Sequence, residues 1–545
     1  MTEKFDSPKP THEHVELSNT TPAMQKLLEQ GVSRSLLEAS EELQLREKGA
    51  GMLQALRYEW RIVLCCLVYL GAALGQGLDN GVGNITNAMP GFLMTFGDFL
   101  PATQSLSIPS VWLSLWTAMT ALGNAIGSLA AGSIIDRWGT KRSLWGLCLA
   151  STAAIAIQVW THSRGQLLAG KILNGIPQGA FVAVAATYIS ETAGVRVRST
   201  LLSLIAFMIM SGVTMGVGIG VHQIAVLSPW GSFRLLYALQ WLLPVIISIL
   251  LIFTPESPTY LLRKGDLDGA RRAILHLYGS RTPDQLEQRL ILIQLALAAE
   301  EEEAQVTGSS TYLDCFHGVD RKRTLTVISV FVTMQFSGIA LGSNTTYFLS
   351  QIPSLPSAAV FDLSLGFLGL SAIVNLFGPF LMEKSGRRLL FVYGNGLQAA
   401  ILLALGALYY STSDAGAWAL GILYNLAIVT AQLTTSCSGF TLSGELSSLR
   451  LRAKTQSIGY ASYYALGWLM QFITPWMFQQ PGNFGVRVAW FYAGLTILAT
   501  ALNFFIIPET RGLSYEDIDH RYAQQVKPRH FERATVASLE EQRKE

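Results

Sequence analysis

The chain alternates long apolar stretches with short polar ones. Each apolar stretch holds about 20 residues, the length that an α-helix needs to cross the ~30 Å hydrocarbon core of a bilayer. The pattern predicts twelve transmembrane helices, many of them rich in the small residues that let helices approach closely in lipid. The predicted spans are residues 62–83, 110–134, 142–160, 166–189, 199–221, 233–254, 324–349, 361–382, 389–410, 417–440, 456–478 and 488–507.

One long charged segment separates the first six spans from the last six. Two such halves around a central loop are typical of secondary transporters. The predicted fold class is therefore an all-α integral membrane protein with two pseudo-symmetric six-helix bundles. The predicted parts are a largely disordered cytosolic tail (1–60) with a short helix around residues 35–47, the first bundle (61–254), a cytosolic linker with short helices (255–323), the second bundle (324–508) and a cytosolic C-terminal tail (509–545).

Composition supports a membrane location. Of the 545 residues, 50% are hydrophobic and 14% are charged, whereas soluble domains carry about 25% charged residues. The lipid bilayer is therefore the first expected partner. The net charge of +2 and the absence of a basic tract exclude nucleic acid as an expected partner.

Lys and Arg concentrate in the loops on one side of the predicted helices. The loops on the other side carry only Arg164, Arg234 and Arg487. By the positive-inside rule, the basic side faces the cytosol. We expect a multi-pass protein of the cell membrane with both termini cytosolic. A single chain contains both bundles, so a monomer is sufficient.

The residues indicate neither an enzyme nor a metalloprotein. The five cysteines form no CxxC pair, and most lie in apolar stretches, where a small buried thiol is the usual interpretation. No nucleotide-binding loop or nucleophile arrangement appears. We expect no catalytic residue, no metal site and no cofactor.

Two short loops repeat the same order of an acid, a glycine and then bases. Asp136 and Arg137 follow the second span, while Glu383, Arg387 and Arg388 follow the eighth. The loops occupy corresponding positions in the two halves, which indicates an internal repeat.

A second repeated pattern places an acid a few residues before arginine at the cytosolic end of a span. Glu191 and Arg198 follow the fourth span, and Glu445, Arg450 and Arg452 follow the tenth. Acids and bases at the membrane edge pair readily. Pairs that join the two halves only when their cytosolic ends meet would bias an alternating-access equilibrium. The alternative is charge that only sets topology.

These motifs resemble those of the sugar porter family of the major facilitator superfamily. Residues 255–261 read PESPTYL and residues 508–512 read PETRG, both similar to elements of that family. Residues 238–244, ALQWLLP, resemble the fungal branch that contains maltose and α-glucoside permeases. The resemblance covers about residues 60–520 and implies the major facilitator fold and proton-coupled solute uptake.

The resemblance also indicates a proton-coupling pair. Asp79 lies where proton-coupled members carry an aspartate, and Lys171 where they usually carry arginine. Helix geometry supports the pairing, because Asp79 is ~26 Å from the inner side of its span and Lys171 is ~8 Å below the outer side. Burial and the lysine charge would compete over the aspartate proton, which links proton binding to solute binding. The alternative is a static structural ion pair.

The predicted substrate site departs from that of hexose carriers in the family. Gln335 keeps one glutamine of the seventh-span pattern, but Ala206, Ala340 and Gly467 stand where amides are usual, and Phe440 replaces a tryptophan. A site with few amides binds a weakly hydroxylated solute or uses other groups. The predicted substrate-binding residues are Gln335, Asn344, Ser371, Phe440, Tyr463 and Tyr464.

The sequence is compatible with three functions. The first is proton-coupled uptake of a sugar, an α-glucoside or related glycoside, with a small-molecule solute and a proton as partners. The second is a carrier or exporter of another small organic solute, such as an organic acid or secondary metabolite. The third is a sugar sensor, which the short C-terminal tail disfavours, because sensors of this family carry long signalling tails.

Overall fold

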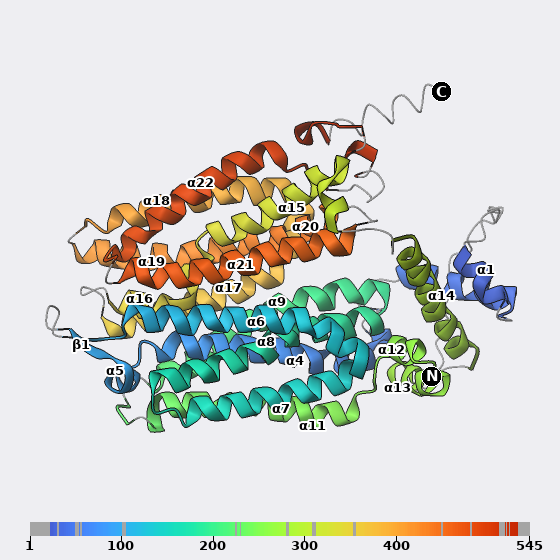
Figure 1. The fold of residues 1–545 in the computed structure, drawn as a ribbon, viewed down its shortest axis with the longest axis horizontal. Helices are drawn as coiled ribbons and strands as arrows, with labels where there is room; N and C mark the ends of the chain where they lie inside the picture. The colour runs from blue at the N-terminus through green and yellow to red at the C-terminus, as the bar shows by residue number, and fades with distance from the viewer. Residues whose placement is uncertain are drawn as a thin grey trace.

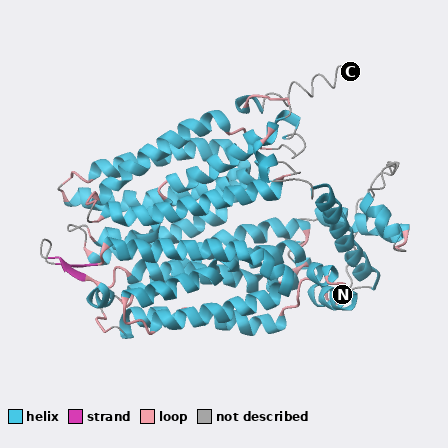
Figure 2. Cartoon of the chain, viewed as in Figure 1, coloured by secondary structure: helices cyan, strands magenta, loops and turns pink. Residues whose placement is uncertain are grey.

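The computed structural model describes residues 22–29, 32–49, 54, 57–100, 105–223, 226–228, 230–279, 283–307, 312–351, 356–411, 413–447, 451–479, 482–511, 518, 520–522 and 524–531. These residues are almost entirely helical (Figure 2). The described part of the chain contains one antiparallel strand pair, β1 (Asp98–Leu100) with β2 (Ser105–Ser107).

The first bundle comprises six spans, the last of which is broken into three pieces. Its helices are α4 (Trp60–Thr86), α6 (Ser110–Trp138), α7 (Thr140–Val159), α8 (Arg164–Thr192), α9 (Val195–Val221) and the series η1 (Trp230–Arg234), α10 (Leu235–Leu239) and α11 (Leu242–Phe253).

The second bundle has six further spans and more interruptions. Its helices are α15 (Gly318–Phe336) with η3 (Ile339–Asn344) and α16 (Thr345–Ser350), α17 (Ser357–Ser385), η4 (Leu389–Tyr393) with α18 (Gly394–Leu408), α19 (Asp414–Ala431) with η5 (Gln432–Ser436) and α20 (Cys437–Leu446), α21 (Arg452–Phe478), and η6 (Gly485–Arg487) with α22 (Val488–Ile506).

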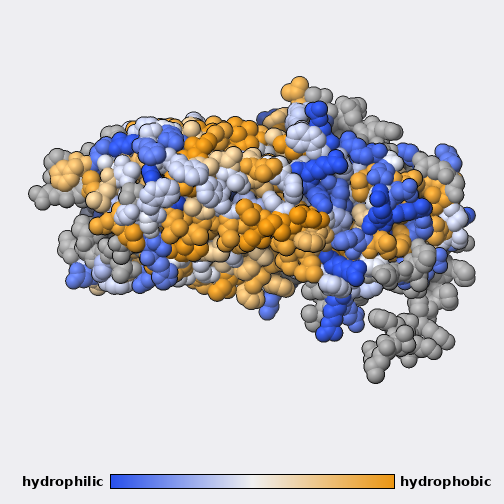
Figure 3. Space-filling view, turned by 90° about the horizontal axis from the view of Figure 1, so that it is seen from below, coloured by the Kyte–Doolittle hydropathy of each residue, from blue (hydrophilic) through white to orange (hydrophobic). Residues whose placement is uncertain are grey.

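The predicted fold class is confirmed. Eleven helices among the described residues are long and apolar enough to cross a membrane. The twelfth is α21, whose 27 residues include Gln456, Tyr463 and Gln471 and are therefore less apolar. The exposed apolar side chains form a band between two hydrophilic ends (Figure 3), as expected for a protein whose solvent there is lipid.

Shorter elements distinguish the two ends of the molecule (Figure 1). At one end lie α12 (Pro258–Arg263), α13 (Leu267–Tyr278) and α14 (Pro283–Thr307), and at the other lie α5 (Pro90–Phe96) and the strands. We call the end with α12–α14 the inner end, following the predicted orientation, and the opposite end the outer end. The remaining short elements are η2 (Tyr312–Phe316) and η7 (Pro528–His530).

Part of the N-terminal tail is ordered against the linker. The tail was predicted to be largely disordered, but its described residues include α1 (Pro22–Glu29) and α2 (Arg34–Gly49). Met24, Leu27 and Leu37 are buried against Ile291 of α14. This small apolar cluster attaches the tail to the linker at the inner end.

Glycines bring backbones of the first bundle into direct contact. A Cβ atom at Gly77 of α4 would lie 1.9 Å from the carbonyl oxygen of Ile209 in α9. One at Gly127 of α6 would lie 1.8 Å from the carbonyl oxygen of Ile176 in α8. Helices in lipid associate through such close packing, because burial of apolar surface gains little there.

The seventh span is broken where it meets the first bundle. Gly338, between α15 and η3, has a φ of 88°, a conformation that favours glycine. The break turns the chain into a 3₁₀ segment and frees backbone groups such as the Gly342 carbonyl for contacts outside the helix. Interrupted helices of this kind line solute sites in membrane transporters.

The glycine packing leads to a stability prediction. Gly127→Ala should lower the free energy of unfolding of the detergent-solubilised protein by about 1–3 kcal/mol, because α6 and α8 must move apart. Its melting temperature should fall accordingly. Gly132→Ala is the matched control on the same helix, since a Cβ there meets nothing within 4 Å. Fluorescence-detected melting of both variants tests the prediction, and equal melting temperatures would contradict it.

Candidate substrate and proton site

A cavity of about 260 Å³ lies between the two bundles. The first bundle contributes residues of α4, α6, α8 and α9, and the second contributes residues of η3, α17, α19, η5 and α21. The lining residues are Asp79, Asn80, Gly83, Asn84, Asn87, Trp116, Thr117, Thr120, Ala121, Asn124, Lys171, Met210, Val213, Ile339, Gly342, Ser343, Leu368, Ile428, Gln432 and Gln471.

Asp79 lies on the cavity wall at the end of a chain of polar contacts. Its carboxylate accepts a hydrogen bond from the amide nitrogen of Asn174 (3.0 Å). The amide oxygen of Asn174 accepts one from the hydroxyl of Ser151 (2.8 Å). Gln240 of the ALQWLLP motif also lies beside the carboxylate. The aspartate is therefore held by a neutral donor of α8, Asn174, which Ser151 of α7 holds in turn.

Lys171 lines the same cavity, so the structure brings the two predicted coupling residues together. Its ammonium lies 5.7 Å from the ring centroid of Tyr237 and is close enough to Asp79 for the charges to interact. No direct ion pair joins the two described side chains, and Asn174 makes the short contact to the carboxylate instead. A coupling role for the pair stays a prediction.

The predicted substrate-binding residues lie outside this cavity. Gln335 is buried at the contact between α15 and α21. Its amide nitrogen lies so close to Gly467 of α21 that a Cβ there would be only 2.9 Å away. Asn344 bonds to the first bundle, and Ser371 lines a separate small pocket. The predicted aromatic residues form a cluster with Phe331 and Tyr460; they are Phe440, Tyr463 and Tyr464.

The cavity carries amides that the sequence analysis did not identify. Asn80, Asn124, Gln432 and Gln471 supply them from both bundles, and the amide oxygen of Asn124 is buried without a hydrogen-bond partner in the described part of the chain. The sequence carried a signal for one of these residues, because Asn80 recurs with Asn84 and Asn87 at the i, i+4, i+7 spacing of one helix face.

Hydrogen bonds join the two bundles on the outer side of the cavity. Asn84 donates to the carbonyl of Gly342 (3.1 Å) and accepts from the backbone N–H of Thr346 (3.2 Å). Asn87 donates to the side-chain oxygen of Asn344 (3.0 Å). We call these three bonds the amide clasp. Because Asn84 lies beyond Asp79 toward the outer end of α4, the clasp closes the outer side of the site.

Two glutamates of the family-like motifs cap helices at the inner end. Glu256 accepts hydrogen bonds from the backbone N–H groups of Thr140 (2.9 Å) and Lys141 (3.0 Å) at the start of α7. Glu509 accepts one from the backbone N–H of Arg387 (3.0 Å), just before η4. A carboxylate at a helix N-terminus satisfies free N–H groups and the positive end of the helix dipole.

The residues predicted in the two repeated loops differ in their exposure and in their hydrogen-bond partners. Asp136 and Arg137 are exposed, and the carbonyl of Arg137 accepts a hydrogen bond from the hydroxyl of Tyr260 (3.1 Å). Arg388 donates to a backbone carbonyl of α22 (3.0 Å). The side chain of Glu383 lies outside the described residues.

Glu191 bonds within the first bundle and its linker. Its carboxylate accepts a hydrogen bond from the hydroxyl of Ser257 and lies 3.8 Å from the guanidinium of Arg263. The predicted partner Arg198 donates to the carbonyl of Ala193 (3.2 Å). These contacts fasten the inner end of α8 to the segment that follows the sixth span.

Glu445 makes an equivalent hydroxyl contact in the second bundle, together with an ion pair to a different loop. It lies 3.3 Å from the guanidinium of Arg387 and accepts a hydrogen bond from the hydroxyl of Thr510 (2.5 Å). Thr510 follows Glu509 as Ser257 follows Glu256, so the repeat extends to the contacts. Arg450 and the side chain of Arg452 lie outside the described residues.

A polar cavity between two helix bundles, closed on one side by bonds between them, defines a multi-pass membrane transporter of the major facilitator fold. A family model described as "Sugar (and other) transporter" matches residues 64–522. The chain belongs to this family.

Relatives and solved structures agree with this assignment. The MFS transporter fmqE of Aspergillus fumigatus is 33% identical over 484 residues, covering 88% of this chain and 89% of its own. The general alpha-glucoside permease of Saccharomyces cerevisiae is 26% identical over 506 residues, covering 91% and 80%. The xylose transporter XylE from E. coli, in an inward open conformation, superposes with a TM-score of 0.67 at 19% identity, covering 84% and 99%.

The amide clasp leads to a prediction about accessibility. Replacing Asn84 and Asn87 by Ala removes three bonds worth ~0.5–1.5 kcal/mol each, which should raise the outward-open population about tenfold or more. The readout is labelling of Ser343→Cys by an external, membrane-impermeant maleimide, with the native cysteines replaced by Ser. Asn375→Ala is the control, because that amide bonds only within α17. Unchanged labelling in the double variant would show that the clasp does not hold the outer side closed.

Proposed function

We propose that the protein takes up a sugar, an α-glucoside or related glycoside, together with a proton by alternating access. The observation that carries this proposal is the cavity itself, where Asp79 and Lys171 lie beside amides from both bundles. The general alpha-glucoside permease is similar over 91% of this chain. XylE, which has the same fold, is described as a proton:xylose symporter.

The cavity lining fits a sugar in two respects. The amides of Asn80, Asn124, Gln432 and Gln471 can donate to and accept from hydroxyl groups. Met210, Ile339 and Leu368 are half-buried in the same lining and offer an apolar surface to the apolar side of a sugar ring, whereas the ring of Trp116 is buried against Phe92 and Phe96. These residues replace the amides that hexose carriers place on the fifth, seventh and eleventh spans.

Asp79 is suited to carry the proton. Burial disfavours the ionised carboxylate of Asp79, whereas the contact to Asn174 and the nearby ammonium of Lys171 favour it, so opposing effects act on its proton. A solute that draws Asn174 or Lys171 toward itself would change the proton affinity of Asp79, and this effect is reciprocal. Proton and solute would then stabilise the same closed state.

A second candidate is transport of a small organic anion, including export. Lys171 places an ammonium in the cavity without a direct ion pair to Asp79. A carboxylate on the solute could form an ion pair with the ammonium of Lys171. Under this proposal the solute, and not a hydroxyl network, provides the main polar contact.

We also propose that the protein works in the cell membrane with both termini in the cytosol. The support is the concentration of Lys and Arg in the loops at the inner end. The linker helices α12–α14 would then lie in the cytosol.

The proton site leads to a transport prediction. Asp79→Asn should abolish accumulation of solute against its gradient but leave exchange of labelled solute across the membrane. A neutral amide keeps the contact to Asn174 but cannot carry a proton. Uptake in transporter-deficient cells at clamped pH measures both activities. Asp98→Asn is the control, since that exposed carboxylate pairs with Arg164 on the outer surface (2.5 Å). Full accumulation in Asp79→Asn would exclude Asp79 as the proton site.

The proposed substrate site can be tested by comparing KM in variants of two glutamines, one in the cavity and one outside it. Gln432→Ala should raise KM for the solute about two- to tenfold, the value of one lost hydrogen bond. Gln335→Ala should change KM less if the cavity is the binding site, because Gln335 packs between helices. The opposite ranking would restore Gln335 as the binding residue. If neither glucose nor maltose competes with uptake while organic acids do, the sugar proposal is wrong and the anion proposal stands.

A further inference from the structure

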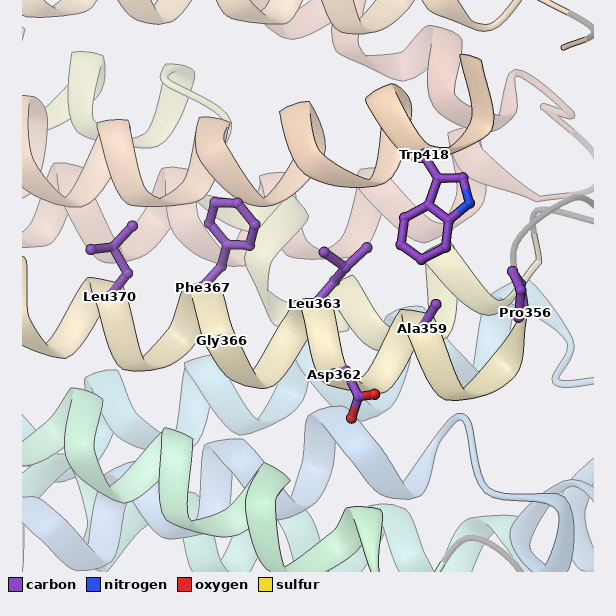
Figure 4. A pocket seen from close by; sticks show the side chains of 8 residues that line it. All are labelled: Pro356, Ala359, Asp362, Leu363, Gly366, Phe367, Leu370 and Trp418. Carbon is purple, nitrogen blue, oxygen red and sulfur yellow. The ribbon is translucent and has the colours of Figure 1, made fainter. Parts of the chain in front are cut away.

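A second, larger hollow lies on the flank of the second bundle. It has a volume of about 560 Å³ and is lined mainly by α17, with Trp418 of α19 (Figure 4). Leu363, Phe367 and Leu370 form its apolar wall. Asp362 supplies the one charged side chain in its lining.

The groove runs from headgroup depth into the hydrocarbon region. Asp362 lies five residues after the start of α17 at Ser357, near the outer edge of the membrane. Leu370 lies eight residues further on, which is ~12 Å deeper at 1.5 Å per residue. One end of the groove is therefore charged and level with headgroups, and the other is apolar and level with acyl chains.

The carboxylate of Asp362 is open to a partner from outside the protein. Its side chain is exposed, and no hydrogen bond or ion pair to it occurs among the described residues. Figure 4 shows the carboxylate directed toward the first bundle, away from Trp418. Helix α17 packs against α9 of that bundle, so the charged end lies near the seam between the bundles. A carboxylate at the edge of the hydrocarbon favours a cationic group beside it.

We propose that this groove binds a phospholipid with a primary amine headgroup, phosphatidylethanolamine. The ammonium contacts Asp362, and one acyl chain lies along Leu363, Phe367 and Leu370. The phosphate lies near the first backbone N–H groups of α17, which have no partner within the helix and favour an anion. A choline headgroup fits less well, because its methylated nitrogen cannot donate a hydrogen bond to the carboxylate.

The test measures which lipids remain bound to the purified full-length protein. The protein is reconstituted in nanodiscs with equal amounts of phosphatidylethanolamine and phosphatidylcholine, released into detergent and analysed by native mass spectrometry. Wild type should retain phosphatidylethanolamine preferentially. Asp362→Asn should lower that preference about two- to fivefold, the range for an exposed ion pair. Asp414→Asn, at the outer end of α19 but outside the groove, should leave it unchanged.

A second pair of variants tests the shape of the groove separately from the charge of Asp362. Gly366→Leu fills the groove and should reduce retention of both lipids, while Gly369→Leu, on the same helix but not in the lining, should not. A Cβ at either position meets nothing within 4 Å, so both variants should fold. Equal retention of the two lipids by wild type, or an unchanged preference in Asp362→Asn, would overturn the proposal. Neither result bears on the proton or solute site.

Discussion

Direct backbone contact between helices of the first bundle is the constraint on which the site depends. In lipid there is no hydrophobic drive to press helices together, so close packing at small residues must hold them. Gly77 and Gly81 of α4 meet the backbone of α9 at Ile209 and Val213, with no room for a Cβ. Asp79 lies between these two glycines, so its depth and direction are fixed by the packing on either side.

The second bundle packs mainly through side chains at its glycines, and the break at η3 falls where it meets the first bundle. Its α15 and α21 pack through side chains such as Gln335 at Gly467, where the first bundle uses backbone contacts. The break at Gly338 lets η3 and α16 present backbone groups to Asn84. A half with direct backbone contacts that holds the charged residues, facing a half with a break at the contact, is suited to a change of state that leaves Asp79 and Lys171 in place.

The sequence predicted the fold and the depth of the two coupling residues, whereas the lining of the cavity between the bundles required the structure. Twenty-residue apolar stretches have few alternatives in a membrane protein, so all twelve spans could be placed. The depth of Asp79 and Lys171 followed from counting residues along two helices, and both line the cavity. Which face of α15 meets the cavity depends on packing against α21, and this places Gln335 between helices. The motif glutamates were recognisable, but their helix-capping contacts required the fold.

The contacts between and within the bundles differ in a way that suits alternating access. The contacts described above for Glu191 and Glu445 are with groups of their own halves, and these contacts need not break when the halves move. The amide clasp joins the halves by three bonds, worth ~1.5–4.5 kcal/mol together at ~0.5–1.5 kcal/mol each. A solute bound with millimolar affinity contributes ~4 kcal/mol. The clasp's share of the cost of opening the outer side is thus of the same order as such a binding free energy, and a solute that binds one state more tightly than the other by a similar amount would shift the population between them.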